Sequence, residues 1–278
     1  MPSKILAALL LLLSTSALAQ LNEAQLAANR GDYTFSINEH TRMAIAGDPN
    51  SQLILGVIYH LGQIVPRNDK VASEWLLKAA TGGNNADAQY LLGNSYDQGL
   101  GVKKNYKVAA DWYRKAAERG VAAAQAQLGR YYLHGLGVKQ NDNDAFLWYS
   151  KAALVNNPDA QQALGLMNYL GRGLPQNPAL ALDWLRKAAA QNHADAQALL
   201  ATMYHHGEGT RKDLVLAYTL FTQALNGNTS VKDALQKHDD IGNQLSEEQR
   251  AASIRLLNQL ARKDNFIAAL DAYLATPP

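Results

Sequence analysis

The chain has 278 residues, of which 47% are hydrophobic and 18% are charged, a composition that supports a sizeable folded core. Its 26 lysine and arginine residues nearly balance its 24 aspartate and glutamate residues, so the chain lacks the basic excess that nucleic-acid binding requires. It contains no cysteine, which excludes disulfides and the attachment of a lipid to a cysteine. We therefore expect a folded protein that is held together by packing alone and has no nucleic-acid partner.

The first twenty residues have the features of an export signal. One cation, Lys4, precedes a nine-residue apolar run over residues 5–13, and small residues follow at Ala17 and Ala19. This order predicts a signal peptide over residues 1–19 that is cleaved after Ala19. A run of nine residues is about half as long as a membrane-spanning helix needs, so we expect no membrane span in the mature chain. The predicted location is the periplasm of a Gram-negative bacterium, with secretion as the second choice.

The next segment, residues 20–50, predicts a pair of helices that departs from the pattern after it. Gly31 separates the two expected helices, and Gly47 follows the second. Glycine suits the left-handed backbone conformation that closes a helix. We interpret this segment as a degenerate N-terminal helix pair at the start of a repeat array.

A pair of glycines two residues apart recurs along the chain. The pairs begin at Gly99, Gly135, Gly171 and Gly207, each 36 residues after the one before. A fixed period of this length is typical of stacked helical repeats. An earlier unit fits the series with a shift of 37, so residues 51–230 predict five repeats.

Each repeat predicts two helices joined by the glycine turn. In the first helix, apolar side chains at Ala88, Leu92 and Tyr96 share one face, as in an amphipathic helix. The second helix is expected to start after a residue type that caps helix N-termini. The predicted caps are Asn105, Asn141, Asn177 and Asp213.

The first helices also contain a glycine, as at Gly93. This residue costs about 1 kcal/mol relative to alanine inside a helix, so we expect a bulky side chain to approach it. The natural neighbours are two bulky columns of the repeats, the tryptophans and the tyrosines Tyr59, Tyr96, Tyr132 and Tyr204. The four tryptophans share one column and are interpreted as core residues rather than as a ligand cage. They are Trp75, Trp112, Trp148 and Trp184.

Lysines stand three residues after each tryptophan, and an acidic residue often precedes the lysine by four positions. That order favours ion pairs along a solvated helix face over an anion-binding track. The pairs predicted in this way are Glu74 with Lys78, Asp111 with Lys115 and Asp183 with Lys187.

Residues 231–278 predict C-terminal capping helices. Ser246 and Gln249 have the spacing of a capping box, which marks the start of a helix. A last helix is expected near residues 265–274. The preceding repeat already departs from the pattern, because Leu220 replaces the tryptophan, and terminal repeats depart in this way when one side has no neighbour.

The repeated pattern resembles a known family. Residues 88–102 read Ala-Gln-x-x-Leu-Gly-x-x-Tyr-x-x-Gly-x-Gly-Val, and Asn105, Ala109, Trp112 and the run Lys-Ala-Ala at 115–117 follow. This pattern resembles the Sel-one-like repeat (SLR), a relative of the tetratricopeptide repeat, over residues 51–230. The resemblance implies an all-α fold, a right-handed α-solenoid of helix-turn-helix repeats, that serves as an adaptor or scaffold. It does not imply one particular partner.

The residues give no support to a catalytic, cofactor or metal site. A phosphate-binding loop follows a strand and opens a helix, whereas a helix precedes each glycine pair here. His134 and His206 share one column but lie two repeats apart, too far to share a metal ion. No serine has the setting of a nucleophile, and cysteine is absent. We therefore expect no enzyme, no cofactor and no metal.

Positions that differ between repeats, while the framework recurs, are the candidates for partner binding. By analogy with tetratricopeptide arrays, the first helices line the concave side, so their variable columns would form a groove. The competing interpretation is ordinary solvent-facing residues. Exposed apolar side chains at Leu133, Tyr169 and Leu170 favour the groove. The candidate partner-binding residues are Asn94, Asp97, Gln98, Arg130, Leu133, His134, Tyr169, Leu170, His205 and His206.

These features predict an exported repeat scaffold that binds a protein or peptide on its concave face, as an envelope adaptor or regulator. One alternative is a periplasmic immunity protein that neutralises a toxic effector. A disfavoured alternative is an envelope hydrolase, either β-lactamase-like or acting on the cell wall, with His134, His205 and Asp97 as the residues to test.

Overall fold

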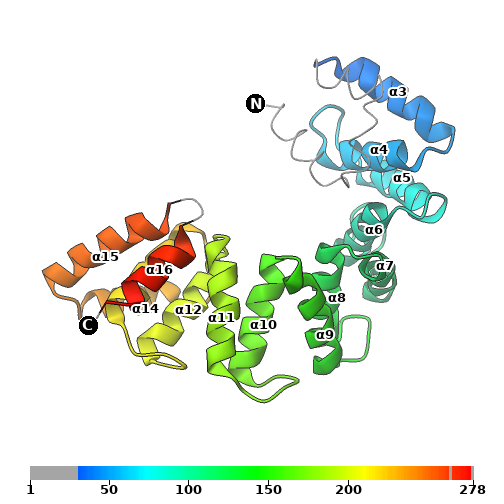
Figure 1. Cartoon of the computed structure of the whole chain (residues 1–278). Coiled ribbons are helices and arrows are strands. Elements are labelled where there is room, and N and C mark those ends of the chain that lie inside the picture. The colour runs from blue at the N-terminus through cyan, green and yellow to red at the C-terminus, as the bar shows by residue number, and fades with distance from the viewer. Residues whose placement is uncertain (1–30, 263–264, 277–278) are drawn as a thin grey trace. The chain divides into compact units, whose positions relative to one another are not determined.

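The computed structural model describes residues 31–262 and 265–276. Over these residues it contains fourteen helices and no strand (Figure 1), so the predicted all-α fold class is confirmed. The predicted signal peptide and the first helix of the predicted N-terminal pair lie outside the described residues. The second helix of that pair is α3 (Tyr33–Ile45), which starts after the N-cap Asp32.

The helices of the repeats are uniform in length, with 13 residues each. Their bounds are α4 (Pro49–Leu61), α5 (Asp69–Thr81), α6 (Ala86–Gln98), α7 (Tyr106–Glu118), α8 (Ala122–His134), α9 (Asp142–Leu154), α10 (Pro158–Leu170), α11 (Pro178–Ala190), α12 (Ala194–His206) and α13 (Leu214–Asn226). Three further helices follow, namely α14 (Ala234–Gly242), α15 (Glu247–Leu260) and α16 (Phe266–Leu274).

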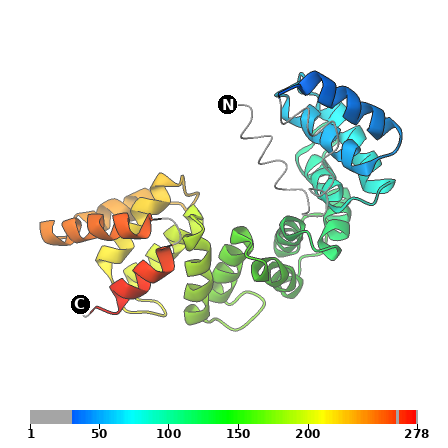
Figure 2. The same cartoon turned by 45° about the horizontal axis from the view of Figure 1, so that its top comes forward.

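The chain divides into two compact units, residues 1–140 and residues 141–278. Unit 1 contains α3 to α8, and unit 2 contains α9 to α16. Consecutive helices pack against one another from α3 to α8 in unit 1 and from α9 to α14 in unit 2, so that each unit contains a stack of helices (Figure 2). The first helices of the pairs are α4, α6, α8, α10 and α12.

The predicted caps define both ends of the repeat helices. In α7, the Asn105 side chain accepts a hydrogen bond from the backbone N–H of Val108 at 3.2 Å, and the equivalent caps of α9, α11 and α13 are confirmed as well. The first helices end at glycine in the left-handed conformation, as at Gly99 with φ of +80°. The capping residues and the glycines that end the helices therefore determine where each helix starts and stops.

The glycine inside the first helix does allow a close approach, but neither the tryptophan column nor the predicted tyrosine column supplies the neighbour. A Cβ placed on Gly93 would lie 2.6 Å from the Tyr113 ring, and one on Gly165 would lie 2.6 Å from Leu185 Cγ. These neighbours follow the tryptophan by one position. Because adjacent residues diverge by about 100° around a helix, the residue after the tryptophan points into the core and the tryptophan is turned towards the surface.

The tryptophan column is therefore only partly buried, which corrects the prediction of core residues. The Nζ atoms of the following lysines lie 4.0 to 4.3 Å from the indole centroids, so each lysine stacks on a tryptophan. The predicted ion pair of Asp111 with lysine is not formed, because Asp111 pairs with Arg114 at 2.9 Å. The lysine and the tryptophan together cover the outer edge of the second helix.

The second glycine of each pair makes a contact that the sequence analysis did not anticipate. Gly101 has φ of +69°, and a Cβ placed on it would lie 2.6 Å from the Lys70 backbone nitrogen, at the start of α5. In unit 2, a Cβ on Gly209 would lie 2.8 Å from the backbone of Pro178, at the start of α11. The glycine turn of one repeat thus rests on the second helix of the repeat before it.

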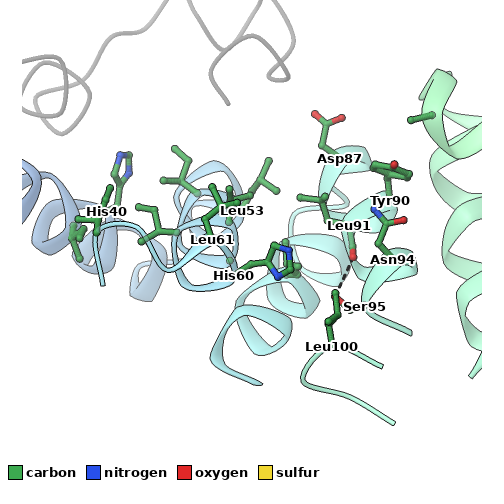
Figure 3. A pocket seen from close by; sticks show the side chains of 18 of the residues that line it. His40, Leu53, His60, Leu61, Asp87, Tyr90, Leu91, Asn94, Ser95 and Leu100 are labelled. Atoms are coloured by element: carbon green, nitrogen blue, oxygen red, sulfur yellow. Dashed lines mark hydrogen bonds between the residues drawn. The ribbon is translucent and has the colours of Figure 1, made fainter. Parts of the chain in front are cut away.

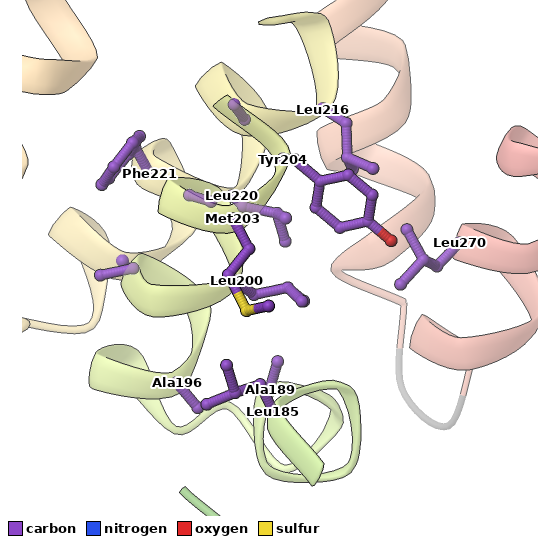
Figure 4. Packing of buried hydrophobic residues seen from close by; sticks show 14 of the residues in the cluster. Leu185, Ala189, Ala196, Leu200, Met203, Tyr204, Leu216, Leu220, Phe221 and Leu270 are labelled. Carbon is purple, nitrogen blue, oxygen red and sulfur yellow. The ribbon is translucent and has the colours of Figure 1, made fainter. Parts of the chain in front are cut away.

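Unit 2 ends in three helices that extend its core. The predicted capping box of Ser246 and Gln249 is present at the start of α15, while α14 was not predicted. Helices α14 and α15 pack on α13, and α16 packs on α11 and α15. Figure 4 shows Leu270 of α16 close to Tyr204 and Leu216, and all three side chains are buried. Helix α16 therefore completes the core of the last repeat.

Candidate functional site

A groove with a volume of about 340 Å³ opens in unit 1 (Figure 3). It runs along α3, α4 and α6 and reaches the start of α8. Because α4 and α6 are the first helices of successive pairs, the groove follows the helices on which partner binding is expected. Most of its wall is apolar, including Leu53, Ile54, Val57, Ile58, Leu61 and Leu91.

Helix α4 is responsible for the apolar character of the groove. Its Val57 and Leu61 occupy the positions at which α6 carries Asn94 and Gln98, given the shift of 37 residues between these two repeats. Leu61 remains 37% exposed, although a leucine gains free energy on burial. These residues were not among the predicted contacts, because the columns of variable residues were compared only from position 94 onward. Adding the first repeat to the comparison reveals them.

The predicted candidates in unit 1 have three different environments. Asn94 and Gln98 line the groove. His134 is exposed at the end of α8. Leu133 is only 8% exposed and belongs to the core, so the expectation of an exposed leucine at this position is wrong.

Asn94, Asp97 and Arg130 form part of a polar network around two buried tyrosines. The Tyr113 hydroxyl donates to Asn94 Oδ1 at 2.7 Å, and the Tyr131 hydroxyl donates to Asp97 Oδ1 at 2.8 Å. Arg130 Nη2 donates to Asp97 Oδ2 at 2.9 Å. Burial, followed by the nearby Asp97 charge, raises the pKa of both tyrosine hydroxyls far above the ordinary range. Both hydroxyls therefore stay protonated and act as donors.

This network shows that positions that differ between repeats can have a structural role. The two tyrosine rings meet edge to face, with centroids 5.2 Å apart, and a buried hydroxyl without a partner is costly. The sequence holds a signal for the compensation. In unit 1 polar Asn94 accompanies Tyr113, and in unit 2 the equivalent positions are the apolar pair Leu166 and Leu185.

The candidates in unit 2 are also divided between packing and surface. The Tyr169 hydroxyl donates to Glu208, and this hydrogen bond, with burial, raises the pKa of Tyr169 to about 12. Leu170 is 54% exposed. His205 is partly buried and its ring stacks on His206, with centroids 4.7 Å apart. Burial, the neighbouring His206 and two lysines lower the pKa of His205.

A serine and a histidine meet at one end of the groove, but they do not form an accessible nucleophile. His40 Nδ1 lies 3.2 Å from Ser51 Oγ. Ser51 is fully buried and His40 is 3% exposed, so a substrate in the groove does not reach the hydroxyl. Asp97, which the hydrolase alternative invoked, already accepts hydrogen bonds from Arg130 and Tyr131. Neither arrangement supports covalent catalysis.

The described residues contain neither a cluster of metal-ligating side chains nor a membrane-spanning helix. Within residues 31–262 and 265–276, no group of three or more histidine, aspartate or glutamate side chains is arranged to hold a metal ion. Over the same residues, none of the helices combines the length and the apolar character needed to cross a bilayer.

Comparison with known proteins identifies the repeat. The Sel1 repeat profile matches residues 49–84, 86–121, 122–157, 158–193 and 194–228, which together make up more than half of the chain. No match was found among curated proteins.

Two solved structures share the fold. A protective antigen of uropathogenic Escherichia coli with an SLR fold is 32% identical, with a TM-score of 0.78 over 89% of this chain and 52% of that one. The present chain thus spans about half the length of that protein. A Sel1 repeat protein from Oxalobacter formigenes is 26% identical, with a TM-score of 0.71 over 85% of this chain and 98% of that one. With five matches to its profile, the chain belongs to the Sel1 repeat family.

Proposed function

We propose that unit 1 binds an apolar segment of a protein partner in the groove along α3, α4 and α6. A Sel1 repeat array is typically a scaffold for protein–protein interaction, and in this groove α4 carries apolar residues at positions where α6 is polar. The observation that carries the proposal is the replacement of Asn94 and Gln98 by Val57 and Leu61 at equivalent positions of α4.

The volume and the lining fit a few apolar side chains. Pockets that bind ligands have volumes of about 300 to 1,000 Å³ and predominantly apolar walls, and this groove has a volume of about 340 Å³. Apolar and aromatic anchors that enter such a pocket supply most of the binding energy in protein interfaces. We infer that the partner inserts two or three such side chains between α4 and α6.

We further propose that the chain acts in the cell envelope as an adaptor, after export directed by residues 1–19 and cleavage after Ala19. The short apolar run that follows Lys4 supports this proposal. The exposed residues His134, Leu170 and His206 remain proposed contacts, each within its own unit.

The test uses the next repeat as a template for removing the apolar surface. In the double variant Val57→Asn and Leu61→Gln, α4 carries the residues that α6 has at the same positions. A photo-crosslinking amino acid at Gln98, on the edge of the groove, is activated in intact cells. We expect a defined crosslinked protein that disappears in the double variant while helicity is retained.

A matched control is Ile254→Gln in unit 2, which changes an apolar side chain that is 60% exposed and does not line the groove. This variant should capture the partner as the unchanged chain does. Absence of any crosslinked protein, or equal capture by the double variant, would show that the groove is not the binding site.

A further inference from the structure

A single carboxylate stands at the edge of the groove. Asp87 of α6 lines it, and Figure 3 shows its side chain beside Tyr90 and Leu91 of the same helix. Among the described residues, none makes a hydrogen bond or an ion pair with this carboxylate. The described residues that line the groove include no lysine, arginine or glutamate. Its two histidines have other partners, because His40 Nδ1 lies 3.2 Å from Ser51 Oγ and His60 Nδ1 lies 2.8 Å from Asp69 Oδ1.

The equivalent aspartates of unit 2 do have partners. Asp159 Oδ1 lies 3.1 Å from Nε2 of His193, which is 34 residues further along the chain. Asp195 accepts a hydrogen bond at 2.7 Å from Thr229, also 34 residues further along. The position 34 residues after Asp87 is Val121. The repeat pattern thus supplies a partner for this aspartate in two other repeats and puts an apolar side chain there in unit 1.

Because residue 121 is a valine, both the Asp87 carboxylate and the first turn of α8 lack the side-chain partner that His193 provides at the equivalent place in unit 2. Val121 is the N-cap residue of α8 and gives no side-chain cap, whereas His193 caps α12 by accepting from the Ala196 N–H at 3.2 Å. Val121 and Asp87 both line the groove. Burial raises the pKa of the Asp87 carboxyl above its ordinary value, because a carboxylate that is partly withdrawn from water without a cation is disfavoured.

We propose that the segment bound in the groove carries a lysine or arginine that pairs with Asp87, next to the apolar side chains that contact α4. This inference rests on the proposed function and specifies its partner. A cation placed here restores the charge compensation that the repeat otherwise provides internally, and a charge-assisted hydrogen bond in apolar surroundings is strong and orienting. Asp87 fixes the register of the bound segment, and the apolar residues supply the affinity.

The probe is a displayed library of random 12-residue peptides, selected on the full chain. Peptides that depend on the groove are those that the variant Val57→Asn and Leu61→Gln fails to retain. We expect them to share apolar residues and one enriched lysine or arginine. Replacing that cation by glutamine in a synthetic peptide should weaken its binding to the unchanged chain about tenfold, as expected for a hydrogen bond to a charged group.

A double-mutant cycle is completed by measuring how the variant Asp87→Asn binds both the cationic peptide and the glutamine peptide. In this variant the lysine and glutamine peptides should bind equally. The control Asp159→Asn removes the equivalent carboxylate of unit 2, and it should keep the tenfold preference. A third variant, Val121→His, supplies the partner that His193 gives Asp159, and it should lower the affinity of the lysine peptide while helicity is retained.

The outcomes separate the two proposals. Peptides that need the groove but show no preference for a cation, or keep that preference in Asp87→Asn, overturn the role of Asp87 and leave the groove as a binding site. A library that yields no groove-dependent peptide overturns both proposals. Concentration-dependent self-association that the Val57→Asn and Leu61→Gln variant abolishes identifies a second copy of the chain as the occupant of the groove.

Discussion

The glycines of unit 1 allow the cost of a repeat contact to be measured by substitution with alanine. Gly99, Gly101 and Gly120 all have positive φ, at +80°, +69° and +88°. A Cβ on Gly120 meets no atom within 4 Å, and one on Gly99 lies 3.3 Å from the Lys104 side chain. A Cβ on Gly101 would overlap the backbone at the start of α5. The three substitutions share the backbone strain, but only the third disturbs contact between repeats.

The magnitudes follow from this difference. A residue other than glycine in the left-handed conformation costs about 1 to 2 kcal/mol, and this is the whole expected cost of Gly120→Ala. Gly99→Ala should cost little more, because the nearest atom is Lys104 Cβ at 3.3 Å, and a shift of about a few tenths of an ångström relieves that contact. In Gly101→Ala the Cβ lies 2.6 Å from the Lys70 backbone nitrogen, so one repeat must shift against the other. Overpacking of this kind adds about 1 to 3 kcal/mol.

Urea denaturation followed by far-ultraviolet circular dichroism measures the change in the free energy of unfolding. The expected order of destabilisation is Gly101 above Gly99, with Gly99 close to Gly120. If Gly101→Ala is no more destabilising than Gly120→Ala, the second glycine is needed only for its backbone conformation, and the explanation of the glycine pair by contact between repeats is wrong.

Three other predictions concern side-chain packing within the individual units. Asn94→Leu should destabilise the chain by about 1 to 3 kcal/mol because it leaves the Tyr113 hydroxyl without its acceptor, and the added substitution Tyr113→Phe should recover most of the loss in urea denaturation. Leu185→Ala should cost about 2 to 5 kcal/mol, clearly more than Trp184→Ala, because Leu185 is buried and Trp184 is partly exposed. Burial lowers the pKa of His40, so the unfolded chain binds a proton at this residue more readily than the folded chain does; stability should therefore fall as the pH drops through about 6.5, the ordinary value for histidine, and His40→Gln should reduce that slope.

The fold was predictable because the same helix caps and turn residues recur in successive repeats. Asparagine or aspartate caps start the second helices, and glycine in the left-handed conformation ends the first ones. A period of 36 residues and a few cap positions therefore determine the helix bounds. The prediction for the tryptophans was wrong by one position, which is about 100° of helix rotation. Hydrophobic character alone does not show which of two adjacent aromatic residues is buried. A lysine stacks on the ring of Trp112 near the surface, whereas Tyr113 fills the core.

The candidate site was less predictable because variation among repeats has two physical causes. Asp97 differs from its equivalents, yet it accepts a hydrogen bond from Tyr131, a buried tyrosine of the next repeat. This departure is compensated within unit 1. A single column of residues does not show the compensation, because the partner lies 34 residues away. The compensation becomes visible only when two columns are compared together, at the sequence separations that stacked repeats bring into contact.

The departures that lack an internal partner are the informative ones for function. Val57 and Leu61 place apolar side chains where the next repeat is polar. Val121 removes the partner of Asp87, although the same column supplies a partner to Asp159. All four residues of unit 1 involved here line one groove. An uncompensated charge beside uncompensated apolar surface is unfavourable in the free chain, and binding of a segment that is apolar and basic removes both costs together. For this reason the charge preference at Asp87 is a sharper test of the scaffold function than the loss of binding alone.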